Sequence, residues 1–276
     1  MNLIIQSPDI ENNDLRELAK RTQADQIVRI TGQAFRLINA NQHEDIAQYC
    51  ADAKLDYAFV NPDLHLSDFG LLAMDMDSTL LAIESIDEVA DMLHIKPQVA
   101  AITQQTMRGE ISFEESITNR TALLKGLNQD ALQKVYDERV KLNPGAEKLL
   151  TQAKTAGLKT MVISGGFTFF TDRIKGKLAL DYAAANTLEI QDNIITGKVV
   201  GEIIGKEGKA KVLKQVRDNL GLKREHIIAI GDGANDLGMM AEAGVSIAYH
   251  AKPIVQENAD YSINYVGLDG VANLFE

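Results

Sequence analysis

The apolar pattern of the first 66 residues predicts a small domain of alternating strands and helices. Short runs rich in β-branched and aromatic residues predict strands at residues 2–5, 26–30, 34–38 and 57–60. Polar stretches with helical periodicity predict helices at residues 11–22 and 43–54. The order strand, helix, strand, strand, helix, strand is that of an α+β ferredoxin-like sandwich. The sequence NPD at 61–63 ends this pattern, and we expect a linker at 62–68.

The pattern changes beyond the linker. Short, almost wholly apolar runs, typical of parallel strands buried on both faces, occur at residues 71–74, 160–163, 182–185, 227–230, 245–248 and 261–264. Helical periodicity lies between several of them, at residues 146–156, 169–177, 209–219 and 237–242. This alternation predicts an α/β fold with a doubly wound, Rossmann-type parallel sheet.

Two segments interrupt the alternation. Residues 83–142 are almost all helix-like and predict a helical cap inserted after the first strand. Residues 188–204 predict a β-hairpin that leaves the sheet. We therefore expect two domains, 1–66 and 67–276, with the cap at about 83–142.

Composition narrows the class of protein. The 276 residues include 39 Asp and Glu against 28 Lys and Arg, a net charge of −11, which argues against nucleic acid as a partner. One cysteine allows no intrachain disulfide. The first residues lack the basic start of a secretory signal, and no apolar stretch approaches the roughly 18 residues of a membrane helix. These features predict a cytoplasmic protein that does not bind membranes.

Acidic residues follow two of the predicted strands. Asp75 and Asp77 follow the strand at 71–74, whereas Asp232 and Asp236 follow the strand at 227–230 in a glycine-containing turn. Carboxyl ends of parallel strands meet at one edge of a sheet, so four carboxylates would repel one another there unless a cation bound. Oxygen ligands with room for water favour Mg²⁺. The other interpretation is that both segments are ordinary polar turns.

Two further features suit a phosphate group at the same edge. Ser164 and Gly165 follow the strand at 160–163, where a hydroxyl and free backbone N–H groups could bind an anion. Lys209 begins a predicted helix, and a site with four acids and a phosphate needs a fixed positive charge. A lone lysine is more often merely solvated.

The sequences DMDST (75–79) and ISGG (163–166), Lys209 and GDGAND (231–236), in this order, resemble the four motifs of the haloacid-dehalogenase-like phosphatases. More narrowly, residues 75–276 resemble the phosphoserine phosphatase family. The resemblance implies that Asp75 is the nucleophile and Asp77 the general acid and base. It implies that Ser164 and Lys209, with Gly165, hold the phosphate group, and that Asn235 orients the phosphoryl group or the attacking water. It also implies that Mg²⁺ is bound by Asp75, Asp232 and the carbonyl of Asp77, with Asp236 supporting its water ligands.

The predicted cap carries residues that match the amino acid pocket of that family. By the resemblance, Glu84 binds the substrate ammonium, Arg120 binds its carboxylate, and Met107 and Phe113 form an apolar wall. Taken from the residues alone, Glu84 and Arg120 are better described as ordinary exposed charges on helices, as most Glu and Arg on helices are.

The resemblance implies hydrolysis of the small molecule O-phospho-L-serine through an aspartyl-phosphate, the last step of serine biosynthesis. Transfer of the phosphoryl group to homoserine by the same fold is the nearest alternative, and a non-catalytic, serine-responsive binding protein is another. The N-terminal domain resembles the ACT-like regulatory domains of some amino acid enzymes. Serine sensing, formation of a homodimer, and a cover without a ligand are all open for it.

Overall fold

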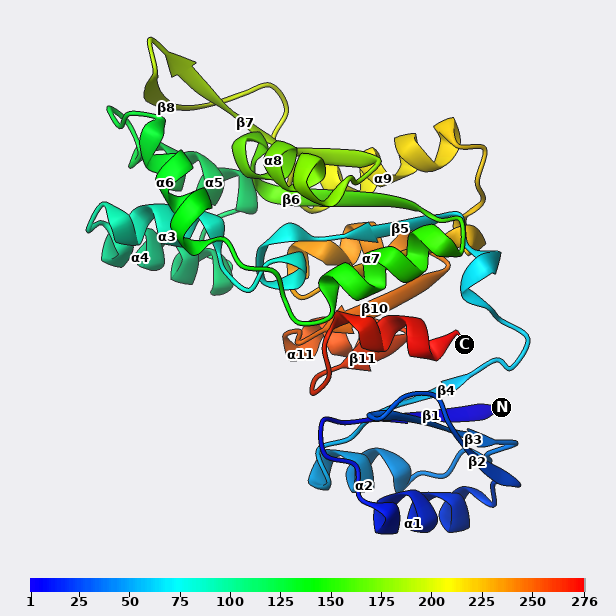
Figure 1. The fold of residues 1–276 in the computed structure, drawn as a ribbon. Coiled ribbons are helices and arrows are strands. Elements are labelled where there is room, and N and C mark those ends of the chain that lie inside the picture. Colours follow the sequence, from blue (N-terminus) through cyan, green and yellow to red (C-terminus); the bar gives the residue numbers. More distant parts are fainter. Residues whose placement is uncertain (276) are drawn as a thin grey trace.

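The structure is a computed structural model that describes residues 1–275, except for the side chain of Met107. Its N-terminal domain has the predicted element order, which is therefore confirmed (Figure 1). The elements are β1 (Asn2–Gln6), α1 (Asn12–Thr22), β2 (Gln26–Arg29), β3 (Ala34–Ile38), α2 (Ile46–Asp52) and β4 (Asp56–Val60). They form an antiparallel sheet of order β2-β3-β1-β4. The helix predicted at 43–54 is shorter, because residues 43–45 form a turn closed by the Ile46 N–H bond to the His43 carbonyl.

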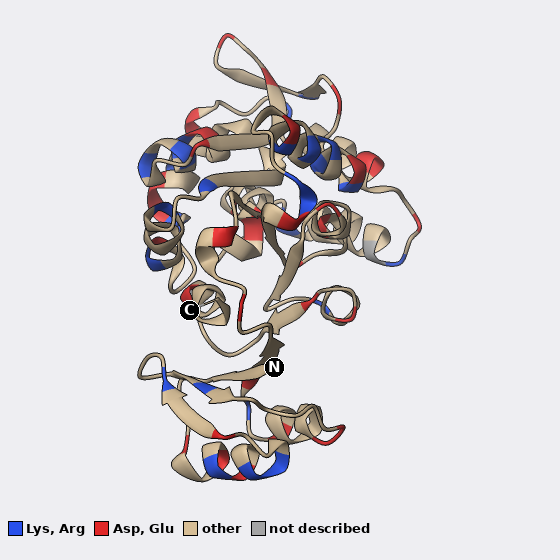
Figure 2. Ribbon diagram, turned by 90° about the vertical axis from the view of Figure 1, so that its right-hand side faces the viewer, with Lys and Arg blue, Asp and Glu red and all other residues tan. Residues whose placement is uncertain are grey.

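Strand β1 is buried on both faces. Successive side chains of a strand point to opposite faces of the sheet, and each face of β1 meets a different apolar core. Leu3 and Ile5 pack with Leu18 and Cys50 from the two helices of the domain. Ile4 points the other way and belongs to the apolar core of the larger domain. The small sheet therefore has helices on one face and the larger domain on the other (Figure 2).

The larger domain contains a seven-stranded sheet of order β11-β10-β9-β5-β6-β7-β8. Its strands are β5 (Leu71–Met74), β6 (Lys159–Phe167), β7 (Tyr182–Gln191), β8 (Ile194–Val200), β9 (Ile227–Gly231), β10 (Val245–Tyr249) and β11 (Tyr261–Ile263). All neighbouring strands are parallel except β7 and β8, which form the predicted hairpin. The prediction that this hairpin leaves the sheet is wrong, because β7 runs unbroken from residue 182 and β8 is the edge strand of the same sheet. The doubly wound α/β fold is thus confirmed.

Side chains of β5 alternate between two apolar clusters. Leu72 and Met74 pack in the cluster that includes α7 (Ala146–Thr155), α8 (Thr168–Leu178) and the 3₁₀ helix η5 (Leu268–Leu274). Leu71 and Ala73 pack in the cluster that includes α9 (Lys206–Asn219), α10 (Leu237–Ala241) and α11 (Pro253–Gln256). Helix α9 begins three residues before Lys209, so the prediction that Lys209 begins this helix is wrong.

The predicted cap consists of four helices, α3 (Ser85–Met92), α4 (Lys96–Met107), α5 (Phe113–Ala122) and α6 (Asp130–Arg139), on one side of the sheet (Figure 1). The β7–β8 hairpin reaches over to them. Gly126 donates its N–H to the carbonyl of Ile195, and Ile195 donates to the carbonyl of Leu127, both at 2.8 Å. These hydrogen bonds attach the cap to strand β8, in addition to the two chain segments that connect the cap to the core.

The N-terminal domain contacts the C-terminal part of the larger domain. The buried carboxylate of Asp56 accepts backbone N–H bonds from Asn264, Tyr265 and Val266 at 2.6, 2.9 and 3.1 Å. Gln6 donates to the carbonyl of Gly270 at 3.0 Å. The connection between the domains contains one 3₁₀ turn, η1 (Leu66–Asp68). Among the described helices, none has both the length and the apolar character needed to cross a membrane.

Candidate active site

The first half of the site is built where β5 ends. Asp75 follows the strand, and the chain then makes one wide turn, η2 (Met76–Leu80), in which Leu81 N–H bonds to the carbonyl of Met76. Ser78 adopts a φ of 57° in this turn, a conformation that non-glycine residues seldom adopt. The buried Oδ1 of Asp75 accepts the N–H of Met76 at 2.7 Å and lies 2.6 Å from the Lys209 ammonium.

The second half is built where β9 ends. Asp236 is buried, with Oδ1 2.6 Å from the Lys209 ammonium. Its Oδ2 accepts the N–H groups of Asp232 and Gly233 at 3.1 and 3.0 Å. A Cβ atom on Gly231 would lie 2.5 Å from the Asp236 Cβ, so this turn requires glycine there. Asp236 therefore holds the turn and Lys209 together.

The carboxylates of Asp75, Asp232 and Asp236 form a cluster that suits a cation. One oxygen from each lies within 4.8 Å of the others. Burial raises the pKa of Asp75 well above its usual value, and the neighbouring carboxylate of Asp236 raises it further. Burial, followed by the charge of Asp236, raises the pKa of Asp232 to about 6. A bound divalent cation would lower both pKa values, and a set of carboxylate oxygens suits a hard divalent cation.

The three carboxylates are not equivalent as metal ligands. Both oxygens of Asp236 already bind Lys209 or backbone N–H groups. Within the described chain, Oδ2 of Asp75 and Oδ2 of Asp232 accept no hydrogen bond. Direct coordination is therefore expected from Asp75 and Asp232, with Asp236 behind them.

Asp77 lies in a different environment. Its carboxylate accepts the N–H of Ser85 at 2.8 Å, the Ser85 hydroxyl at 3.1 Å and the Ser164 hydroxyl at 3.3 Å. Burial, followed by the charge of Glu84, raises the pKa of Asp77 to about 7. A carboxyl group that titrates near neutral pH can both donate and accept a proton, as a general acid and base must.

The region after residue 163 differs in part from the prediction. Strand β6 continues through Gly166 to Phe167, and Gly166 donates its N–H to the Ser164 hydroxyl at 2.8 Å. That N–H group is thus used within the protein and is not free for an anion. A Cβ atom on Gly165 would lie 2.7 Å from Cζ of Phe113, so glycine here allows the cap to approach the strand.

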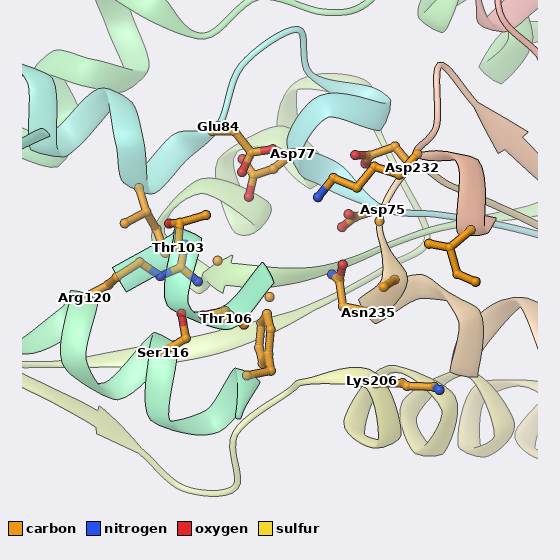
Figure 3. Close-up of a pocket in the computed structure, with 18 residues that line it drawn as sticks. Asp75, Asp77, Glu84, Thr103, Thr106, Ser116, Arg120, Lys206, Asp232 and Asn235 are labelled. Atoms are coloured by element: carbon orange, nitrogen blue, oxygen red, sulfur yellow. The ribbon is translucent and has the colours of Figure 1, made fainter. Parts of the chain in front are cut away.

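A cavity of about 470 Å³ lies between the sheet edge and the cap (Figure 3). The predicted site residues that line it are Asp75, Asp77, Glu84, Phe113, Arg120, Gly165, Asp232 and Asn235. Ser164, Lys209 and Asp236 are wholly buried behind this lining. The Met107 side chain, predicted as part of the apolar wall, lies outside the described residues.

Arg120 and Glu84 face the cavity from the cap side. Nε of Arg120 is buried and has no hydrogen-bond partner within the described structure, and burial lowers the pKa of its guanidinium. The description as an ordinary exposed charge therefore does not fit Arg120. Glu84 is exposed, but the Ser78 hydroxyl donates to it at 2.6 Å and fixes its carboxylate.

Several residues that the sequence analysis did not single out take part in the site. Thr79 donates to Asp232 at 3.0 Å, and Ser85 holds Asp77. Lys206 and Lys252 line the cavity. The rule that ligands bind at the carboxyl ends of strands could have identified Lys252, which follows β10 closely. Ser85 gave no such signal, because its role depends on how the cap begins.

Comparisons with known proteins agree with this geometry. Residues 72–241 match the family model described as haloacid dehalogenase-like hydrolase, and residues 3–46 match a domain of unknown function, DUF4072. A phosphoserine phosphatase from Polaromonas sp. (strain JS666) is 52% identical over 218 residues, which cover 77% of this chain and 92% of that protein.

Two solved structures resemble nearly the whole chain. A HAD family hydrolase from Salmonella enterica serovar Typhi has a TM-score of 0.89 at 34% identity, covering 100% of this chain and 98% of that one. A probable phosphoserine phosphatase from Vibrio cholerae, in unliganded form, has a TM-score of 0.87 at 33% identity, covering 99% and 86%. The likeness therefore includes the N-terminal domain.

Proposed function

The chain belongs to the haloacid dehalogenase-like hydrolase family, and from this membership we propose that it hydrolyses O-phospho-L-serine to L-serine and phosphate. This reaction is the last step of serine biosynthesis, and we assign it to the cytoplasm. The observation that carries the choice of substrate is the Arg120 guanidinium in the cavity beside Glu84, because its buried Nε has no hydrogen-bond partner among the described residues. An amino acid supplies a carboxylate for Arg120 and an ammonium for Glu84.

The proposed first step uses Asp75 and Asp77. An oxygen of Asp75 attacks the phosphorus atom, and the bond between phosphorus and the serine oxygen breaks. Asp77, with a pKa of about 7, gives its proton to the departing serine oxygen. The buried Lys209 ammonium, held by Asp75 and Asp236, lies where negative charge accumulates.

In the proposed second step, water attacks the phosphorus atom of the aspartyl-phosphate. Asp77 takes a proton from that water, the bond between phosphorus and Asp75 breaks, and phosphate leaves. Two easier displacements thereby replace one difficult hydrolysis. Mg²⁺, held by Asp75, Asp232 and the carbonyl of Asp77, would offset the repulsion between the nucleophile and the phosphate dianion.

The substrate requirement follows from the two charges on the cap. A site that leaves Arg120 or Glu84 without its counter-charge loses the free energy of that pairing. Phosphomonoesters that lack the carboxylate or the ammonium are therefore expected to be poor substrates.

The test is phosphate release from O-phospho-L-serine with Mg²⁺ and with EDTA, beside O-phosphoethanolamine, 3-phosphoglycerate and p-nitrophenyl phosphate. A homoserine acceptor is included, and O-phosphohomoserine is measured directly. Mg²⁺-dependent release that strongly prefers phosphoserine supports the proposal. Preference for another ester overturns phosphoserine as the substrate, and transfer to homoserine overturns water as the acceptor. The absence of turnover on every ester overturns the proposal that the protein is an enzyme.

A further inference from the structure

The loop that follows β10 forms part of the cavity rim. Lys252 and Ile254 both line the cavity, on the side that carries Asp232. Lys252 donates its N–H to the carbonyl of Asp232 at 3.1 Å. The position of this loop therefore affects a candidate metal ligand directly.

The same loop is held from its other side by the segment after β11. His250 has a φ of 46°, an infrequent conformation for a non-glycine residue, and donates its N–H to the carbonyl of Ile263 at 2.7 Å. Its ring Nε2 lies 3.1 Å from the carbonyl oxygen of Val266. Two contacts thus fix the loop to residues 263–266.

Residues 264–266 are in turn held by the N-terminal domain. Their three consecutive N–H groups converge on one side chain, the buried Asp56 carboxylate at the beginning of β4. Three donors on one carboxylate fix a backbone segment more firmly than a single contact does. No other side chain of the described N-terminal domain accepts hydrogen bonds from this segment.

We propose that Asp56 is a positioning residue for the active site, and that the N-terminal domain acts through it to hold the loop at 250–254 against Asp232. The contacts form one continuous sequence, from Asp56 to Val266, from Val266 to His250, and from the His250 loop to Asp232. This gives the N-terminal domain a role in catalysis that requires no ligand of its own.

The kinetic test, which rests on the proposed phosphatase activity, compares Asp56→Ala with Gln6→Ala. Both substitutions remove a buried side-chain contact between the domains, but Gln6 contacts η5 at Gly270 and Asn273, away from the loop. We expect Asp56→Ala to lower kcat/KM roughly tenfold, Asp56→Asn to lower it less, and Gln6→Ala to leave it within about twofold. Equal losses in Asp56→Ala and Gln6→Ala would overturn the proposal, since they would indicate a general effect of loosened domains.

Amide hydrogen exchange provides a test that does not need turnover. Asp56→Ala is expected to speed exchange of the His250 and Lys252 amides at least about tenfold, while amides in β5 and β6 keep their protection. Unchanged exchange at those two amides overturns the proposal, and so does uniform acceleration across the larger domain. If the wild-type protein fails to hydrolyse phosphoserine, the proposed function is lost, whereas this measurement still decides the role of Asp56.

Discussion

Charge pairing around Lys209 distinguishes the carboxylate of Asp75, the proposed nucleophile, from that of Asp236. The Lys209 side chain is fully buried, and its ammonium lies 2.6 Å from both Asp75 and Asp236. Burial lowers the pKa of Lys209, but the two carboxylates, Asp236 first, more than offset that effect and raise it. Oδ1 of Asp236 binds Lys209 and its Oδ2 accepts two backbone N–H groups, whereas Oδ2 of Asp75 accepts no hydrogen bond from any described residue.

Replacing the nucleophile should abolish turnover without unfolding the protein. Asp75→Asn keeps the shape of the side chain and an oxygen that can accept the Met76 N–H. We expect kcat to fall at least about 10³-fold, because an amide cannot form the aspartyl-phosphate. Phosphate release measures activity, and circular dichroism measures folding. Retention of more than a few per cent of wild-type turnover by a folded Asp75→Asn protein would contradict the assignment.

The raised pKa of Asp77 predicts how activity depends on pH. The proposed first step needs protonated Asp77, whose pKa is about 7. Raising the pH through 7 removes that proton, so kcat/KM for phosphoserine should be level at lower pH and fall about tenfold per unit well above pH 7. p-Nitrophenyl phosphate is the control, because its leaving group needs no proton. A fall of the same size for both esters would point to another group.

Arg120 should control selectivity more than chemistry. Arg120→Met keeps most of the apolar volume and removes the charge that faces the cavity. We expect kcat/KM for phosphoserine to fall about 100-fold, and the value for phosphoethanolamine, which lacks the carboxylate, to change less than threefold. Steady-state kinetics on both esters in both proteins provide the comparison. Parallel losses on the two esters would mean that Arg120 shapes the cap and does not recognise the carboxylate.

At the scale of elements, the turn after β5 depends on a residue far along the chain. The Asn143 side-chain amide donates to the carbonyls of Ser78, Thr79 and Leu81, at 3.2, 2.8 and 3.1 Å. Asn143 lies just before α7, where the chain returns from the cap to the core. Asn143 therefore connects the segment that leads into the cap with the segment that leads out of it.

Removing the Asn143 side-chain hydrogen bonds should lower the stability of the protein. Asn143→Ala leaves three carbonyls without their donor, and we expect the free energy of unfolding to fall by about 1–3 kcal/mol. Urea unfolding followed by circular dichroism measures this change. Asn143→Asp is the matched control, because it keeps the size but loses the donor, and it should be at least equally destabilised. An Asn143→Asp protein as stable as wild type would show that the three hydrogen bonds do not matter.

The sequence predicted those features that depend on local pattern. Runs of apolar residues located β5, β9 and β10 to within one residue, and the acids that follow β5 and β9 meet at one edge as expected. Features that depend on tertiary contact were not predictable. Ser85 reaches Asp77 only because of how α3 leaves the wide turn, and β6 extends to Phe167 beyond its predicted end at 163.

At the scale of the whole molecule, an acidic protein carries an acidic cluster at its cavity. The chain carries a net charge of −11, and four acidic side chains line the cavity. Lys206 and Lys252 line it too, and neither forms an ion pair with any described residue. With Arg120, three basic side chains face these four acids, so the imbalance of charge is local to the cluster of Asp75, Asp232 and Asp236, where a bound cation would relieve the repulsion between carboxylates.

This imbalance predicts that Mg²⁺ stabilises the protein. A ligand that binds only the folded state adds about 2.7 kcal/mol at a free concentration 100 times its Kd, which corresponds to a Tm increase of roughly 5 °C for a domain of this size. Thermal unfolding is measured across a Mg²⁺ titration at constant ionic strength, with EDTA as the metal-free reference. Asp232→Asn should lose most of the increase, because Asp232 supplies one of the two carboxylate oxygens left free for a metal. An equal increase in Asp232→Asn would locate the stabilising ion elsewhere.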